Sequence, residues 1–121
     1  MEKLTPQEEN IMRCFWKLGP GQIRDIIGLQ TDPQPYTTVA SIANNLRRKG
    51  YLMVTKRGNS YEYAPLIPES AYKREFVGGV VDSYFHNSYK EMVSFFAKEQ
   101  KISVDELKEI IQLIDKGTSE P

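Results

Sequence analysis

Residues 36–57 read YTTVASIANNLRRKGYLMVTKR, and this pattern predicts a short helix followed by a strand. Val39, Ile42, Ala43 and Leu46 recur at the spacing of one side of an α-helix. Gly50 is expected to end the helix. The other side carries short hydrogen-bonding side chains and a cation: Thr37, Thr38, Ser41, Asn44, Asn45 and Arg48. Such a face suits the base edges and phosphates of DNA.

The charge around this stretch is one-sided. No Asp or Glu occurs from Pro33 to Tyr61. The same region holds five cations: Arg47, Arg48, Lys49, Lys56 and Arg57. The whole chain of 121 residues has no formal net charge, yet residues 1–68 hold nine Lys or Arg against six Asp or Glu, whereas residues 69–121 hold seven against ten. This asymmetry indicates that one half of the chain meets a polyanion.

The sequence also excludes several classes of protein. Cys14 is the only cysteine, so an internal disulfide and an all-cysteine metal site are impossible. His86 is the only histidine and has no neighbours at metal-ligand spacing, so we expect no metal, no cofactor and no catalytic set. The first residues lack the apolar core of a signal peptide, and no apolar run approaches the roughly 20 residues that span a bilayer. We therefore expect a soluble cytoplasmic protein that is not an enzyme.

The elements around residues 36–57 predict a winged helix-turn-helix over residues 1–68. Thr5, Pro6 and Glu8 have the pattern of a capping box that opens a helix, which Gly19 ends. Residues 22–29 form a second helix and residues 36–49 a third. Residues 51–56 and 61–65 form a hairpin around a turn at residues 58–60. In this arrangement the third helix is offered to the major groove of DNA.

Residues 69–121 are predicted to be a helical dimerisation domain of three helices. They run over residues 70–85, from Tyr89, and from Ser103 to Gly117, after which the chain is expected to fray. Gly78 and Gly79 interrupt the first of them, either for close approach of another helix or as a local kink. About 50 residues cannot bury this much apolar surface alone, which favours a two-fold dimer and a near-palindromic operator. The expected dimer contacts are Phe76, Val80, Tyr84, Met92, Phe96, Leu107, Ile110, Ile111 and Ile114.

The expected DNA contacts come from the third helix and the hairpin tip. They are Tyr36, Thr37, Thr38, Ser41, Asn44, Asn45, Arg48, Lys49, Lys56 and Arg57. Asn can pair with adenine through two hydrogen bonds, and Thr can offer its methyl group to thymine. Two plainer interpretations remain open: the cations at the helix end could serve only the helix dipole, and those at the hairpin tip could protect an edge strand.

The residues from Tyr36 to Leu52 resemble the recognition helix and wing of the penicillinase-repressor (BlaI/MecI-type) family. Residues 4–16, 93–98 and 103–107 resemble the same family's first helix and dimerisation half, so the resemblance covers roughly residues 4–116. It implies a dimeric transcriptional repressor, released in some members when a membrane sensor–protease system causes cleavage at an Asn–Phe bond. The matching positions here are Phe95 and Phe96, so the Asn is absent. The paired cysteines of the copper-responsive branch are absent too.

A second function class stays open at this point. A winged helix can serve as a protein–protein adaptor without sequence-specific DNA binding, in which case the acidic half from residue 69 would be the main contact surface. The two hypotheses differ in whether the polar face of residues 36–49 binds DNA.

Overall fold

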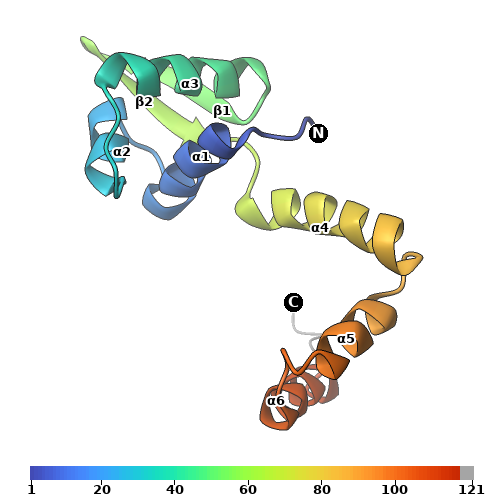
Figure 1. Cartoon of the computed structure of the whole chain (residues 1–121). Helices are drawn as coiled ribbons and strands as arrows, with labels where there is room; N and C mark the ends of the chain where they lie inside the picture. The colour runs from blue at the N-terminus through green and yellow to red at the C-terminus, as the bar shows by residue number, and fades with distance from the viewer. Residues whose placement is uncertain (118–121) are drawn as a thin grey trace. The chain divides into compact units, whose positions relative to one another are not determined.

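A computed structural model describes residues 1–117, and the fraying expected after Gly117 lies outside them. Over these residues the chain forms six helices and one antiparallel hairpin (Figure 1). The elements are α1 (Pro6–Leu18), α2 (Ile23–Leu29), α3 (Tyr36–Arg48), β1 (Leu52–Arg57), β2 (Ser60–Pro65), α4 (Glu69–Phe85), α5 (Tyr89–Lys98) and α6 (Val104–Asp115). The prediction of a mainly helical winged-helix protein with a β-hairpin wing is confirmed. Two compact units are present, Met1–Phe76 and the chain from Val77 onward.

The first helix begins as its sequence predicts. The Thr5 hydroxyl accepts a hydrogen bond from the Glu8 amide at 3.2 Å, and the Glu8 carboxylate accepts one from the Thr5 amide at 2.9 Å. This reciprocal capping box satisfies two amides that a helix start leaves without partners. At the other end, Gly19 adopts a positive φ of 83° and donates its amide to the Phe15 carbonyl at 2.7 Å.

The core of the first unit lies between α1, α2, α3 and the base of the hairpin. The four apolar residues that face inward from α3 (Val39, Ile42, Ala43 and Leu46) are buried, and Phe15 and Met12 of α1 are fully enclosed. Burying one such side chain contributes about 1.5–3 kcal/mol, so this core fixes α3 against its neighbours. Trp16 is half-buried at the edge, where its indole N–H donates to the Ile67 carbonyl at 2.8 Å.

The wing is a two-stranded hairpin with a third segment beside it. Leu52 pairs with Pro65 and Arg57 with Ser60, so Ser60 belongs to the return strand and the turn is Gly58–Asn59. Gly58 has a φ of 64°, which glycine adopts without a Cβ penalty. Gly21 exchanges two backbone hydrogen bonds with Tyr63, at 2.9 and 2.8 Å. This bridge ties the α1–α2 connection to the wing.

The helix α4 runs from Glu69 to Phe85 without a break, so the predicted interruption at Gly78 and Gly79 is wrong. A helix tolerates an internal glycine at a cost of about 1 kcal/mol, and the helix here continues through both. Close approach of another helix does not account for them within residues 1–117. A Cβ at Gly78 would lie 3.7 Å from the Tyr89 hydroxyl, and one at Gly79 would meet nothing within 4 Å.

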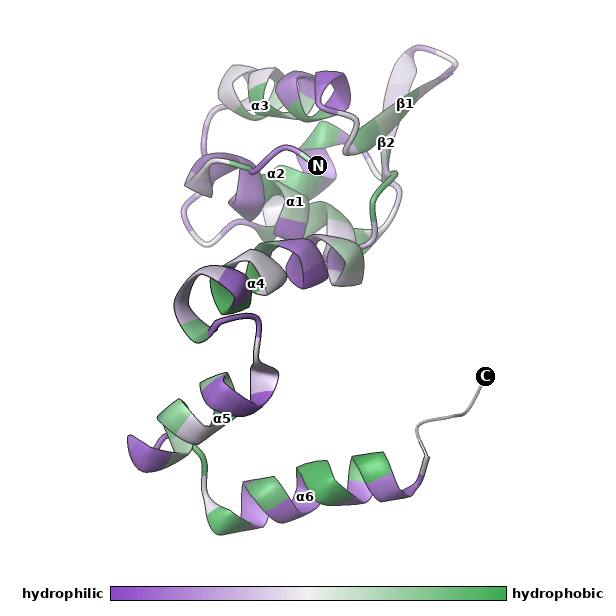
Figure 2. Ribbon diagram, turned by 90° about the vertical axis from the view of Figure 1, so that its right-hand side faces the viewer, coloured by the Kyte–Doolittle hydropathy of each residue, from purple (hydrophilic) through white to green (hydrophobic). Residues whose placement is uncertain are grey.

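The second unit leaves most of its apolar side chains exposed. After α4, His86 and Asn87 take positive φ values of 53° and 59°, which end the helix. Ser88 caps α5, and Ser103 with Glu106 forms a capping box at the start of α6. Neither α5 nor α6 buries a residue, although α6 carries hydrophobic and hydrophilic residues in alternation along its length (Figure 2). Val81 is the one buried hydrophobic residue described from Val77 to Gly117.

Among residues 1–117, none of the helices has the length and apolar character that crossing a membrane requires.

Candidate nucleic-acid interface

The third helix presents one polar stripe to solvent. Thr37, Ser41, Asn44 and Arg48 follow one another at steps of four, three and four residues, which places them on one side of α3. All four are exposed, while the opposite side of the helix is packed into the core. We call these four residues the α3 stripe. A rigidly backed helix with an open polar side is the arrangement that reads base edges in the major groove.

Two predicted residues lie beside the stripe rather than on it. Thr38 and Asn45 are half-buried on the side toward Ile42. On the opposite flank, Tyr36 is 58% exposed at the first turn, directly after Pro35. The structure therefore brings the predicted polar residues to one helix surface. The exposed α3 stripe runs along its middle, the half-buried Thr38 and Asn45 lie on one flank, and Tyr36 lies on the other.

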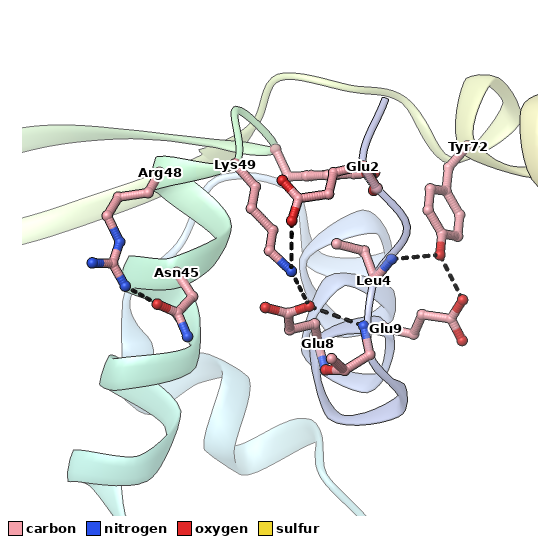
Figure 3. A network of polar contacts seen from close by, with 10 residues as sticks. Glu2, Leu4, Glu8, Glu9, Asn45, Arg48, Lys49 and Tyr72 are labelled. Carbon is pink, nitrogen blue, oxygen red and sulfur yellow. Dashed lines mark hydrogen bonds and ion pairs between the residues drawn. The ribbon is translucent and has the colours of Figure 1, made fainter.

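Both asparagines of α3 are bound by arginines three residues further on. The Asn44 side-chain oxygen accepts hydrogen bonds from Arg47 Nε at 3.1 Å and Nη2 at 2.9 Å. The Asn45 oxygen likewise accepts from Arg48 Nη2 (Figure 3). Arg47 is one of the cations at the end of this helix, for which a phosphate contact and a role toward the helix dipole both stay open. Its two bonds to Asn44 place it beside the α3 stripe, and the three-residue Asn–Arg spacing is typical of such pairs on a helix.

Lys49 points away from the α3 stripe, so the geometry does not favour its predicted DNA contact, which stays a prediction. Its ammonium lies 2.7 Å from Glu8 Oε1 and 3.6 Å from Glu2 Oε2, toward the first turn of α1 (Figure 3). The physical reason is helix geometry, because Lys49 follows the last turn on the side that faces α1. There the nearly buried Glu8 carboxylate needs a partner.

The pKa values of this pair follow from their contact. Burial alone would raise the pKa of Glu8, but the hydrogen bonds from Lys49 and from the Thr5 amide outweigh it and leave the pKa below its usual value. The hydrogen bond to Glu8 raises the pKa of Lys49 despite partial burial. Both groups are therefore charged near neutral pH, and the Lys49 charge is already neutralised inside the protein.

The wing tip carries two cations with different surroundings. Arg57 Nε lies 3.0 Å from the Glu62 carboxylate on the paired strand. Lys56 is exposed, and the described part of the chain gives it no ion-pair partner. Asn59 is exposed at the turn itself. Lys56 is consequently the wing cation without a neighbouring acid among residues 1–117, whereas Arg57 shares its charge with Glu62.

The remaining candidate residues have ordinary structural surroundings. His86 Nδ1 lies 3.2 Å from Glu91 at the exposed α4–α5 turn. Cys14 is partly buried, and burial raises the pKa of its thiol, which disfavours the reactive thiolate. Residues 1–117 contain no group of three or more His, Cys, Asp or Glu side chains that could hold a metal ion.

A winged helix with an acid-free polar recognition helix defines a class of DNA-binding regulators. A model of the penicillinase repressor family matches residues 4–116, so this chain belongs to that family. It is a family of transcriptional repressors rather than of enzymes. The resemblance predicted over roughly residues 4–116 is thereby confirmed.

Individual relatives are similar at low identity. The methicillin resistance regulatory protein MecI of Mammaliicoccus sciuri is 21% identical over 94% of this chain and 94% of its own length. The penicillinase repressor of Bacillus licheniformis is 22% identical over 93% of this chain and 90% of its own. An uncharacterized 16.5 kDa protein of Latilactobacillus sakei is 30% identical over 69 residues. This match covers 55% of this chain and 47% of the length of that relative.

This chain is also similar to a solved structure, that of BpsR of Bordetella bronchiseptica. DNA binding by BpsR is regulated by 6-hydroxynicotinic acid. The two proteins are 16% identical, and the match covers 98% of this chain and 78% of the BpsR chain, with a TM-score of 0.49. Similarity at this level says nothing of the ligands of this chain.

Proposed function

We propose that this protein is a repressor that binds operator DNA through α3 and the wing. The observation that carries the proposal is the α3 stripe, an exposed row of Thr, Ser, Asn and Arg on a helix whose other side is fully packed. No carboxylate lies on α3, and the cations Arg47 and Arg48 occupy its last turn. Such a surface attracts a polyanion and still offers neutral donors and acceptors to bases.

The two kinds of side chain have separate tasks in this proposal. Asn44 reads a base edge, because an amide can both donate to and accept from adenine. Arg47 and Lys56 contact phosphates, which fixes the register of the helix in the groove without reading sequence. Arg47 also holds the Asn44 amide by its oxygen, so the amide is oriented before DNA arrives. Preorganisation of this kind lowers the entropy cost of binding.

A homodimer formed by the second unit completes the proposal. The exposed apolar residues predicted as dimer contacts include Tyr84 at 75%, Ile111 at 54% and Ile114 at 68%. Exposed apolar side chains recur on α4, α5 and α6, and a second copy of the chain is the simplest cover for them. Two-fold symmetry then pairs two α3 helices with a near-palindromic operator.

Release by a membrane sensor–protease system is a further part of the proposal, supported by membership of the family alone. If it operates, the cut falls between Phe95 and Phe96 in α5. There both rings pack against Phe85, with ring centroids 5.7 and 6.3 Å away. A cut there would separate α6 from the rest of the chain and remove part of the proposed dimer surface.

Binding to the DNA upstream of its own gene tests the proposal. We expect one short dyad to be preferred over random duplex, and loss of that preference in the triple variant Asn44→Ala, Asn45→Ala, Arg48→Ala. If no fragment is preferred over random DNA, the repressor proposal is wrong. If the triple variant keeps both its cellular phenotype and its partners, the adaptor alternative is favoured instead.

A further inference from the structure

A cleft of about 290 Å³ lies between the start of α2, the start of α3 and the tip of the wing. It belongs entirely to the first unit, and it is distinct from the α3 stripe, with which it shares no residue. Its walls come from three segments of the chain: Gln22, Ile23, Arg24, Tyr36, Asn59, Ser60, Tyr61 and Tyr63. We call it the α2–wing cleft.

The lining of the α2–wing cleft consists largely of hydrogen-bond donors. Arg24 is exposed and supplies a guanidinium, and no acid within residues 1–117 forms an ion pair with it. Tyr36 is 58% exposed and Tyr61 53% exposed, which is high for large aromatic side chains. Asn59 adds an amide. Not one of the lining residues carries a carboxylate, so the cleft has a net positive charge.

The carboxylates nearest in sequence are both occupied. Asp25, next to Arg24, accepts a hydrogen bond from the Gln22 amide at 2.9 Å and so caps α2. Glu62, between Tyr61 and Tyr63, pairs with Arg57. Tyr63 is half-buried among the lining residues, and burial together with the neighbouring Tyr36 hydroxyl raises its pKa.

We propose that the α2–wing cleft is a seat for one phosphodiester group of the DNA backbone. In this seat Arg24 supplies the charge, and the hydroxyls of Tyr36 and Tyr61 supply neutral hydrogen bonds. The inference rests on the proposed function and deepens it, because it adds residues from α2 and the wing that anchor the duplex. Tyr36 directly precedes Thr37 of the α3 stripe, so a phosphate held here flanks the bases that the stripe reads. Contacts of this kind fix the register of a DNA-binding helix.

The same chemistry could in principle serve a free anion, such as inorganic phosphate or a small phosphorylated effector. The surroundings of the α2–wing cleft favour the DNA backbone over a free anion. The cleft offers one cation, and both flanking tyrosines face solvent, so an isolated phosphate would keep most of its water and gain little. A phosphodiester is held in place by the other contacts of the duplex along α3 and the wing, so one cation and two hydroxyls suffice to fix it.

The test measures duplex affinity against salt concentration for three variants. Arg24→Gln removes the charge, Tyr61→Phe removes one hydroxyl, and Lys73→Gln is a matched control that removes one exposed cation of the same unit outside the cleft. We expect Arg24→Gln to weaken binding about tenfold at moderate salt, equally for operator and random duplex. The slope of log affinity against log salt should fall by about 0.9 per bound copy. Tyr61→Phe should weaken binding by a few-fold and leave the slope unchanged, since the phenol is neutral.

Three outcomes would overturn the inference. One is that Arg24→Gln matches Lys73→Gln in affinity and slope. Another is that it changes the preference between operator and random duplex, which would make Arg24 a base reader. The third comes from titrating inorganic phosphate without DNA: saturable shifts of the Tyr36 and Tyr61 ring resonances at submillimolar phosphate, lost in Arg24→Gln, would assign the cleft to a free anion.

This design separates the inference from the proposed function. If wild-type protein prefers no fragment, the repressor proposal fails, yet random duplex still reports on the phosphate seat through the salt slope. Conversely, if wild-type protein clearly prefers its operator and Arg24→Gln leaves the salt slope unchanged, the repressor proposal stands and the phosphate-binding role of the α2–wing cleft is refuted. Thermal unfolding of each variant shows whether it folds, and since Arg24, Tyr61 and Lys73 are all exposed, the melting temperatures should be close to that of wild type.

Discussion

The Lys49 ammonium lies 2.7 Å from the Glu8 carboxylate and thereby ties the end of α3 to the first turn of α1. The Glu8 side chain is only 6% exposed and that of Lys49 21%. The next residue, Glu9, accepts a hydrogen bond from the Tyr72 hydroxyl of α4 at 2.6 Å, and the same hydroxyl accepts one from the Leu4 amide (Figure 3). Two adjacent glutamates thus contact the end of α3 on one side and the start of α4 on the other.

Replacing Glu8 with Gln should destabilise the first unit by about 2 kcal/mol. The change removes a charge-assisted hydrogen bond and leaves the Lys49 ammonium without its closest anion in a partly buried place. Chemical denaturation measures the loss as a lower midpoint with an unchanged slope. Lys73→Gln is the control, because Lys73 pairs with Glu69 only at 3.9 Å on the surface and should change stability by less than about 0.5 kcal/mol. Equal stability of the Glu8 variant and wild type would contradict this role for the pair.

Lys49 and Arg48 should differ in their effect on DNA binding although they are neighbours. Arg48→Gln should weaken binding to operator and lower the salt slope, because Arg48 is exposed on the α3 stripe. Lys49→Gln should lower protein stability but leave the salt slope unchanged, since its charge is engaged by Glu8 and Glu2. The measurement is affinity for the preferred duplex at several salt concentrations, made well below the melting temperature of each variant. A reduced slope for Lys49→Gln would place Lys49 at the DNA after all.

Stability should fall at both ends of the pH range, for different groups. The pKa of Glu8 is lowered on folding, so its contribution is present above the unfolded value of about 4.5 and is lost as the pH falls through the folded value. Burial, with the hydrogen bond to Glu9, raises the pKa of Tyr72 to about 12 from 10. A raised pKa means that the folded state holds the proton more tightly, so this contribution is present below pH 10 and is lost between 10 and 12.

Tyr72→Phe isolates the contribution of Tyr72 to the alkaline limb of this profile, to which the raised pKa values of Tyr51 and Tyr63 also contribute. We expect the variant to be less stable at neutral pH, because two hydrogen bonds of the hydroxyl are gone. Its free energy of unfolding should also fall less steeply than that of wild type between pH 10 and 11. Lys49 remains in the variant, and its raised pKa produces a residual loss of stability as the pH rises through its folded value. Parallel curves for the two proteins would show that Tyr72 does not titrate as described.

The sequence predicts the fold of the first unit well because its signals are local. The apolar spacing of α3, the capping box at Thr5 and the glycines after α1 and α3 each act within a few residues, and each is found where expected. Gly78 and Gly79 mislead for the same reason, since a local propensity cost does not decide whether a longer helix continues through them. Local patterns therefore predict which type of element a segment forms, but they do not predict whether a long helix continues through two unfavourable residues.

The candidate site was predictable in part. The polar side of α3 follows from periodicity, and its residues are indeed exposed or half-buried on one surface. The partner of Lys49 is 41 residues away in the sequence, so no spacing rule reveals that its charge is already used. The α2–wing cleft likewise joins Arg24, Tyr36 and Tyr61 from three segments. Such groupings depend on how distant segments pack, which a single sequence does not display.

The proposed dimer can be tested on α6 without disturbing the folded unit. Ile111 is 54% exposed in the single chain, so Ile111→Glu should not unfold it, yet it places a charge in the proposed interface. Two-fold symmetry counts the loss twice, at about 2 kcal/mol for each isoleucine, which raises the dimer dissociation constant about a thousandfold. Gln112→Glu adds the same charge on the polar side of α6 and is the matched control. Sedimentation over a range of concentrations should give dimers for wild type and the control and monomers for Ile111→Glu, with operator affinity falling in step. Dimers of undiminished strength in Ile111→Glu would show that the interface lies elsewhere than on this side of α6. A monomeric wild type would refute the proposed dimer itself.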